Sequence, residues 1–278
     1  MNPTLPPALR VLRLAVLATG AVAMLYPYAW MISASLKPQT EIFSTSLSLI
    51  PQQWAAAENY AKAMTRIPML RVLGNGVLVC TLVLVFQIAF ALPCAYALAK
   101  LRFRGREALF GLVMLGLLVP IHALSIPLYA VARETALLDT YAVLVLPFVL
   151  STFAIFLFRQ FIRALPDDLI AAARLDGLGE GAIVWRIVLP NAWPAATAFA
   201  VFSVVAHWND LYWPLITVSK PSLATPPLGI LFFKAAEAGD DYGALMAATV
   251  VVTAPLVLLF LAAQRTFIDG MTMTGLKG

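Results

Sequence analysis

Charged residues are scarce in this chain. Asp, Glu, Lys and Arg together make up 12% of its 278 residues, whereas soluble domains carry about 25%. Hydrophobic residues make up 62%. This composition excludes a water-soluble globular domain and predicts an integral membrane protein.

Cysteine and histidine are also rare, with two residues of each. Cys80 and Cys94 fall in one apolar run, about 21 Å apart if that run is helical, which excludes a disulfide between them. The sequence contains no H-E-x-x-H or paired-cysteine spacing for a metal and no G-x-x-x-x-G-K-[ST] loop for a phosphate. We therefore expect no enzymatic activity, metal or cofactor.

Long apolar runs are what the sequence does have. Six segments carry no charged side chain and reach the roughly 17 to 25 residues that a helix needs to cross a bilayer. They predict an all-α protein with six transmembrane helices. The fifth helix is expected to start late, because Asn191 and Pro194 suit a loop, and to continue past Asp210 toward Val218. The runs are residues 14–36, 72–99, 108–132, 140–158, 187–209 and 242–264.

Lysine and arginine are unevenly distributed over the predicted loops. If the N-terminus is cytoplasmic, twelve of the 19 lie inside and seven outside, so the positive-inside rule predicts cytoplasmic N- and C-termini. Aromatic residues at the end of the first run indicate a retained helix rather than a cleaved signal peptide; they are Tyr26, Tyr28 and Trp30. The seven outer residues are Lys37, Lys62, Arg66, Arg71, Arg133, Lys220 and Lys234.

One membrane domain is expected to cover nearly the whole chain. Residues 1–13 are predicted to be a cytoplasmic leader and residues 269–278 a cytoplasmic tail. Between them, residues 14–268 form the six-helix domain, with a large inner loop at residues 163–194.

Two outer segments are expected to contain short helices. Residues 37–71 hold three prolines, and the stretch 54–63 between them predicts a helix lying at the membrane interface. Residues 219–243 are rich in proline at first and predict a helix near residues 231–238.

The polar segment 166–190 lies between two apolar runs. Asp167 and Asp168 follow Pro166, which suits the first turn of a helix because carboxylates there face the positive end of the helix dipole. Gly177 can adopt a positive φ and end that helix. A second short helix is predicted for residues 180–188. The side chains expected on one face of it are Ile183, Val184 and Ile187.

This segment resembles the EAA loop of permease subunits of bacterial ABC importers, in which E-A-A is followed by three residues, a glycine and later I-x-L-P. Here the pattern reads Ala171-Ala172-Ala173, then Gly177, then Ile187-Val188-Leu189-Pro190. Ala171 departs from it, since the family usually has glutamate there. The resemblance implies coupling helices that sit in a cleft of a cytoplasmic ATPase; the alternative is an amphipathic loop lying on lipid headgroups. The residues implied at the ATPase contact are Leu169, Ala172, Ala173, Arg174, Leu175, Asp176, Gly177 and Leu178.

Nearly the full chain resembles the second, smaller permease subunit of carbohydrate-type ABC importers, as in maltose systems. Order and spacing of several short segments carry the resemblance rather than any one motif. They include Glu58-Asn59-Tyr60, Ala95-Tyr96-Ala97-Leu98-Ala99-Lys100, Leu138-Asp139-Thr140-Tyr141, Arg159-Gln160-Phe161, Trp208-Asn209-Asp210 and the ending 270–278.

The resemblance implies a type I ABC importer permease of the bacterial cytoplasmic membrane. It implies a sister permease subunit, two ATPase subunits that bind the ATP, and a periplasmic or lipid-anchored solute-binding protein. Membrane lipid surrounds the chain, and no nucleic acid is expected. The cargo would be a sugar or related polyol. The short tail would reach the ATPases with Lys277, a frayed tail being the alternative.

A polar and aromatic cluster interrupts the fifth apolar run. A carboxylate there is costly unless it faces a cavity or a partner, so Asp210 and its neighbours predict a lining for a sugar path. Gln87 and His122 lie in the second and third runs. The alternative for all of them is hydrogen bonding between helices. The candidate path residues are Gln87, His122, Trp208, Asn209, Asp210, Tyr212 and Trp213.

An ATP-independent secondary transporter or channel with six spans is the alternative function. Such a protein is expected to carry membrane-embedded charges for ion coupling. Asp210 alone meets that description in the sequence.

Overall fold

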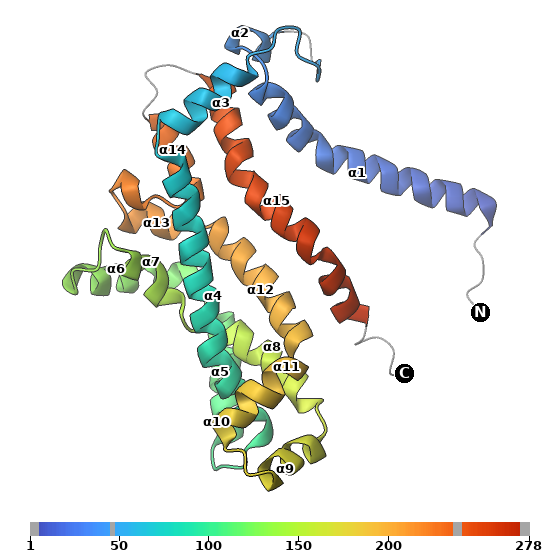
Figure 1. Cartoon of the computed structure of the whole chain (residues 1–278), viewed down its shortest axis with the longest axis vertical. Helices are drawn as coiled ribbons and strands as arrows, with labels where there is room; N and C mark the ends of the chain where they lie inside the picture. Colours follow the sequence, from blue (N-terminus) through green and yellow to red (C-terminus); the bar gives the residue numbers. More distant parts are fainter. Residues whose placement is uncertain (1–5, 45–47, 236–240, 273–278) are drawn as a thin grey trace. The chain divides into compact units, whose positions relative to one another are not determined.

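The computed structural model describes residues 6–44, 48–235 and 241–272 (Figure 1). Every regular element in these three ranges is helical, which confirms the all-α prediction. A helix satisfies its backbone N–H and C=O groups internally, as a segment surrounded by lipid must.

Most of the helices follow one another with short connections. The elements are α1 Pro7–Ser35, α2 Gln39–Ile42, α3 Ala56–Thr65, α4 Met69–Lys100, α5 Arg106–Leu118, η1 Ile121–Leu124, α6 Ser125–Glu134, α7 Tyr141–Val145, η2 Leu146–Phe148, α8 Thr152–Arg163, α9 Asp167–Leu175, α10 Glu180–Ile183, η3 Val184–Val188, α11 Leu189–Asn191, α12 Trp193–Trp208, α13 Tyr212–Thr217, η4 Pro221–Leu223, α14 Pro226–Ala235 and α15 Tyr242–Thr272.

Three helices within the described residues are long and apolar enough to cross a membrane: Ala8–Ser35, Met69–Lys100 and Tyr242–Ala262. Three further helix pairs pass the same test together but are bent, by 92° at Arg106–Leu118 and Ile121–Glu134, 43° at Tyr141–Phe148 and Thr152–Arg163, and 81° at Glu180–Asn191 and Trp193–Trp208. The described chain thus holds three to six candidate spans, six if each bent pair is one span.

The fifth apolar run differs from its prediction at both ends. Asn191 is already helical, and α12 stops at Trp208 instead of continuing past Asp210 toward Val218. Local capping explains why α12 ends early. The Asn209 side chain donates to the carbonyl of Val205 (2.8 Å), and Asp210 Oδ1 accepts from the backbone N–H of Trp213 (3.3 Å), so a separate helix begins there.

The short helix predicted within residues 54–63 is confirmed as α3, which begins and ends two residues later. The prediction for residues 231–238 was wrong at its start, because α14 begins at Pro226. Proline is favoured in the first turn of a helix, where its missing N–H has no partner to lose. Residues 236–238 lie outside the described residues.

The chain divides into two compact units, one formed by Met1–Met69 with Ile230–Ala254 and the other by Leu70–Gly229 with Pro255–Gly278. In the second unit, the end of α4 shares a buried core with α8, α12 and the helices between them. Members of this core include Tyr96, Phe158, Ile162, Ile183, Val188 and Phe199.

Two glycines of the second unit allow close helix contact. A Cβ on Gly76 of α4 would lie 2.5 Å from the Pro226 ring, and one on Gly229 of α14 would lie 2.6 Å from Val72. Both distances are far below van der Waals contact. Only glycine therefore lets α4 and the start of α14 approach this closely.

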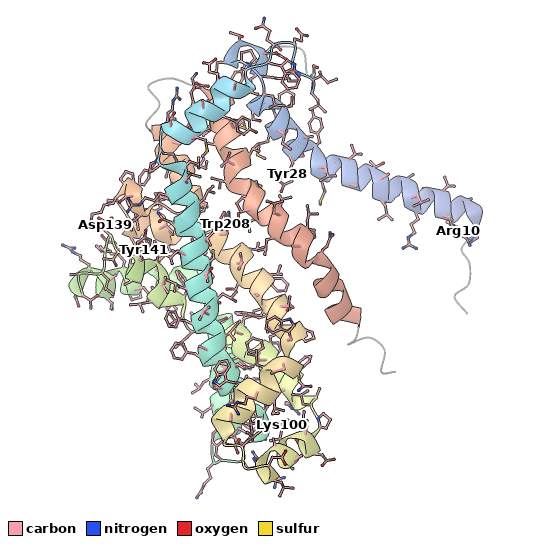
Figure 2. All side chains as sticks on the ribbon, viewed as in Figure 1. Arg10, Tyr28, Lys100, Asp139, Tyr141 and Trp208 are labelled. Atoms are coloured by element: carbon pink, nitrogen blue, oxygen red, sulfur yellow. The ribbon has the colours of Figure 1, made fainter. Side chains whose placement is uncertain are left out.

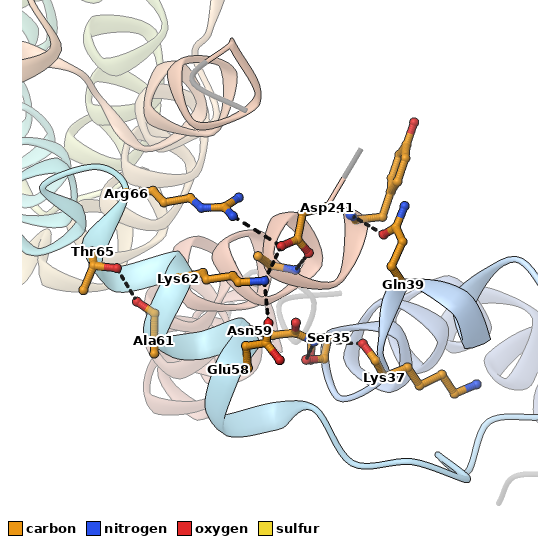
Figure 3. Close-up of polar contacts among 12 residues, drawn as sticks. Ser35, Lys37, Gln39, Glu58, Asn59, Ala61, Lys62, Thr65, Arg66 and Asp241 are labelled. Atoms are coloured by element: carbon orange, nitrogen blue, oxygen red, sulfur yellow. Dashed lines mark hydrogen bonds and ion pairs between the residues drawn. The ribbon is translucent and has the colours of Figure 1, made fainter. Parts of the chain in front are cut away.

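In the first unit, an ion-pair network joins α3 to the start of α15 (Figure 3). Lys62 Nζ lies 2.8 Å from Asp241 Oδ2 and 2.7 Å from Glu58 Oε1, and Arg66 Nη2 lies 3.4 Å from Asp241 Oδ2. Partial burial raises the pKa of Asp241, but hydrogen bonds from Lys62 and the Ala244 N–H outweigh it and leave this pKa below its ordinary value. The stabilisation is therefore present at neutral pH and is lost only as pH falls through the lowered pKa.

We predict that Gly243→Ala destabilises this unit. The Asn59 amide donates to the carbonyl oxygens of Ser35 and Lys37 (both 2.9 Å), and a Cβ on Gly243 would lie 2.7 Å from that amide and 2.9 Å from the Lys37 carbonyl oxygen. Overpacking of this kind costs about 1–3 kcal/mol, seen as a lower Tm in detergent. In α1, Gly20 has nothing within 4 Å of its added Cβ, so Gly20→Ala is the control. Equal Tm for Gly243→Ala and wild type would contradict the packing described.

Candidate functional site

The loop between α8 and α12 begins with α9, whose bounds match the predicted ones. Pro166 precedes the helix, and Asp167 and Asp168 occupy its first turn. Gly177 has φ +80° and donates to the Arg174 carbonyl (3.0 Å). The predicted helix start and glycine turn are confirmed.

The second predicted loop helix is longer than expected. It begins at Glu180 as predicted, but passes through a π-helical turn at Val184–Val188 and continues to Asn191. Pro190 has no N–H to donate to a carbonyl one turn earlier. A π-helical turn before the proline is one way in which the backbone hydrogen bonds of the helix can rearrange around it. Ile183 and Val188 are fully buried, so this helix is part of the core.

Both ends of α9 are bonded to the last turn of α4. At its start, Lys100 Nζ lies 2.6 Å from Asp167 Oδ1 and donates to the Leu165 carbonyl at 2.6 Å. Figure 2 labels Lys100 among the side chains of the structure. Just beyond the end of α9, the Tyr96 hydroxyl donates to Glu180, whose other oxygen accepts from Arg174 Nε at 2.8 Å. Tyr96 and Lys100 are four residues apart and share one face of α4.

The hydrogen bond from Lys100 lowers the pKa of the Asp167 carboxyl below its ordinary value. This contact therefore stabilises the folded protein at any pH above the ordinary pKa of an aspartate. That stabilisation is lost as the pH falls through the lowered pKa of Asp167. The contact between Lys100 and Asp167 is therefore intact at neutral pH.

Arg159 fixes the same end of α4 from the side of α8. Its guanidinium is buried, lies 3.6 Å from the Phe110 ring centroid, and donates through Nε to the Leu98 carbonyl (3.2 Å). Nη2 also lies 3.4 Å from Glu107. A buried, partnered arginine with a stacked ring holds several elements in one arrangement. The turn of α4 that carries α9 is thereby packed firmly.

The implied ATPase-contact residues divide between two faces of α9 and its turn. Ala173 is buried, Leu178 is half-buried against the core, and Leu169 is half-buried. The opposite face is exposed, with Leu175 90% accessible. Exposed among the implied residues are Ala172, Arg174, Leu175, Asp176 and Gly177. Lys277 lies outside the described residues.

Five of the seven candidate path residues line one cavity of about 550 Å³: His122, Asn209, Asp210, Tyr212 and Trp213. The His122 and Tyr212 rings meet edge to face, 5.0 Å between centroids. The Trp213 indole N–H donates to the Val143 carbonyl at 2.7 Å. The structure thus gathers side chains from two regions that are far apart in the sequence.

Gln87 and Trp208 do not line that cavity. Gln87 is buried and links three elements, donating to the Phe148 carbonyl (2.9 Å) and accepting from Ser203 (2.6 Å). This is the interhelical bonding considered as the alternative for Gln87. Trp208 is also buried and packs beside Gly76.

Sequence reasoning missed Tyr96, Lys100 and Glu180 as partners of the loop, and Ser125 and His207 in the cavity wall. The four-residue spacing of Tyr96 and Lys100 was visible. Their partners were not, because those contacts span 67 and 84 residues of sequence.

Comparison with known proteins decides the family. The family described as binding-protein-dependent transport system inner membrane component matches residues 87–272. The chain belongs to this family. It is therefore a permease subunit of a binding-protein-dependent ABC importer, a multi-pass inner-membrane protein that is not itself catalytic. The predicted family, membrane location and lack of enzymatic activity are confirmed.

Relatives of the permease cover nearly its whole length. An arabinooligosaccharides transport system permease protein of Halalkalibacterium halodurans is 32% identical over 93% of both chains. A lactose transport system permease protein of Rhizobium radiobacter is 29% identical over 94% of both. An sn-glycerol-3-phosphate transport system permease protein of Yersinia enterocolitica is 32% identical over 92% of this chain and 93% of that one.

The permease also has the fold of a solved transporter. It superposes on a chain of a bacterial ABC transporter involved in the import of the acidic polysaccharide alginate, with a TM-score of 0.84, 20% identity, and coverage of 96% of this chain and 100% of that one. This similarity confirms the predicted ABC importer permease fold.

We predict that Glu180→Arg frees the second end of α9, because it replaces the acceptor shared by Tyr96 and Arg174 with a like charge. Hydrogen–deuterium exchange of residues 167–178 in the purified permease should become several-fold faster. Adding Arg174→Glu restores opposite charges and should return exchange toward wild type. Glu134→Gln on α6 is the matched control. Unchanged exchange in Glu180→Arg would contradict the anchoring role.

Proposed function

We propose that this permease is one of two non-identical membrane subunits of an importer for a sugar or related polyol, and that α9 is its lever for ATP-driven movement. The observation that carries the proposal is the double anchoring of α9. Its exposed face is available to a partner, while both of its ends are bonded to the same turn of a helix long enough to span the membrane.

The lever has a simple mechanical basis. When two ATPase subunits close on ATP, a helix seated between them moves with them. Lys100 and Tyr96 then pass that displacement to the end of α4. The shared core around Phe158 and Ile183 moves with it, because densely packed interiors shift as units rather than deform.

The remaining partners follow from the same assembly. A sister permease would complete the translocation path, and a periplasmic or lipid-anchored solute-binding protein would deliver cargo to the outer segments 37–71 and 219–243. With twelve basic residues assigned inside, both termini are cytoplasmic. Residues 1–13 would be the leader, 14–268 the membrane domain and 269–278 the tail, whose Lys277 would reach the ATPases.

Three names among the relatives support the cargo class. Those relatives are named for arabinooligosaccharides, lactose and sn-glycerol-3-phosphate, all polyhydroxylated molecules. The ATP-independent alternative has no comparable support, because the family operates with binding proteins.

We predict that Gly177→Asp abolishes uptake and ATPase coupling while the protein still inserts. Gly177 has φ +80° with open space around an added Cβ, and aspartate tolerates a positive φ better than most residues. The substitution therefore adds a carboxylate to the docking face without a core clash. Uptake by cells and ATPase activity of the purified importer are the measurements. Gly177→Asn, which tolerates a positive φ and adds no charge, should retain substantial uptake. Normal uptake by Gly177→Asp would refute the docking role.

We also predict that α9 faces the cytoplasm. In a Cys80→Ala/Cys94→Ala background, a membrane-impermeant maleimide should label Asp168→Cys in inverted vesicles and not in intact cells. Lys220→Cys, in the outer segment, should show the reverse. Labelling of Asp168→Cys from outside intact cells would overturn both the topology and the lever.

A further inference from the structure

The cavity beside α12 and α13 has a distinctive chemical character. Among its lining residues, all of them described by the structure, stand one carboxylate, Asp210, and no lysine or arginine. Phe148, Tyr212 and Trp213 supply aromatic surface. Its volume of about 550 Å³ lies in the range of about 300–1,000 Å³ typical of small-molecule sites.

The hydrogen bonds of the lining residues determine which of their polar atoms remain free to accept from a ligand. Ser125 Oγ donates its single proton to the His122 carbonyl (2.6 Å), so in its 3.1 Å contact with Tyr212 the tyrosine hydroxyl must be the donor. The Tyr212 oxygen then keeps lone pairs for a ligand. Trp213 has given its indole N–H to Val143 and can act only as a wall.

Asn209 and Asp210 add further acceptors. Asn209 donates through its amide nitrogen to the Val205 carbonyl (2.8 Å), which leaves its side-chain oxygen as an acceptor. Asp210 accepts hydrogen bonds from the backbone N–H groups of Trp213 (3.3 Å) and Tyr212, and it interacts electrostatically with His122. The ion pairs of the described residues include none to this carboxylate. A carboxylate accepts several hydrogen bonds at once. His122 and His207 also line the cavity, and an imidazole can donate as well as accept. The polar side of the cavity therefore combines several acceptors with two imidazole rings, beside aromatic walls.

From this arrangement we infer that the cavity is a subsite for one neutral polyhydroxylated unit, a sugar ring or polyol, and that it discriminates against anionic cargo. Hydroxyl groups supply the donors that these acceptors need, and aromatic walls suit the C–H faces of a sugar ring. An anion would meet Asp210 with no lysine or arginine of the lining to compensate it, and juxtaposed like charges suppress binding. The inference rests on the proposed function and specifies its cargo.

The test uses the complete importer in nanodiscs, without its binding protein, and measures binding by saturation-transfer NMR. Lactose and an arabinooligosaccharide are the neutral probes, and sn-glycerol 3-phosphate is the anionic one. Asp210→Asn removes the charge but keeps the oxygen that caps α13. Tyr212→Phe removes the hydroxyl and keeps the ring. On α6, Glu134→Gln and Tyr129→Phe, at positions outside the cavity lining, are the matched controls.

Wild type should bind at least one neutral probe in preference to the anionic one. Asp210→Asn should weaken neutral binding about tenfold, as loss of a hydrogen bond to a charged group does, and narrow the preference over the anion. Tyr212→Phe should weaken it several-fold, and both controls should match wild type. Equal ATPase activity in all variants shows that they are folded and assembled.

Several outcomes would overturn the inference. They are stronger binding of sn-glycerol 3-phosphate, no binding of either neutral probe, or neutral binding that neither cavity variant changes. Each of these leaves the ATPase lever standing, because that role is decided separately by the Gly177 variants. Normal uptake in Gly177→Asp would instead overturn the lever and leave the cavity result standing.

Discussion

The attachment of α9 to one turn of α4 is the interaction on which the functional argument depends. Lys100 and Tyr96 provide bonds to both ends of the short helix, and Arg159 packs the same region from α8. By itself α9 would be a nine-residue helix, too short to be stable in water. These contacts, together with the burial of Ile170 and Ala173 in the core, hold it in place. With them, α9 keeps a fixed position relative to α4, a helix long enough to span the membrane. Everything proposed about energy coupling needs that fixed position.

Features set by neighbouring residues were predictable from the sequence. The start of α9 after Pro166 and its end at Gly177 depend on dihedral preferences and the helix dipole, which act within one turn. The apolar runs were equally predictable, because the thickness of the bilayer sets how many apolar residues a spanning helix needs. The fifth apolar run was predicted to continue as a helix past Asp210, but side-chain capping outweighed its hydrophobicity. Side-chain caps at Asn209 and Asp210 ended one helix and began another.

The rest depended on contacts between distant residues. The sequence suggested that His122 and Tyr212 line a path. No sequence pattern showed that their rings meet edge to face, or that the Trp213 indole N–H donates to the Val143 carbonyl. Gln87 illustrates the same limit. A glutamine in a membrane helix needs partners, yet whether these are cargo or Ser203 and Phe148 is decided only when the helices are packed.

The close contact of α4 with α14 has a consequence for how this chain can diverge. Any single-base change at Gly76 or Gly229 that replaces the residue adds at least one carbon, which would fall about 2.5 Å from Pro226 or Val72. Such a change needs a second one in the facing residue to make room. These two crossing points therefore constrain evolutionary drift through steric volume alone, whatever cargo a descendant of this protein comes to carry.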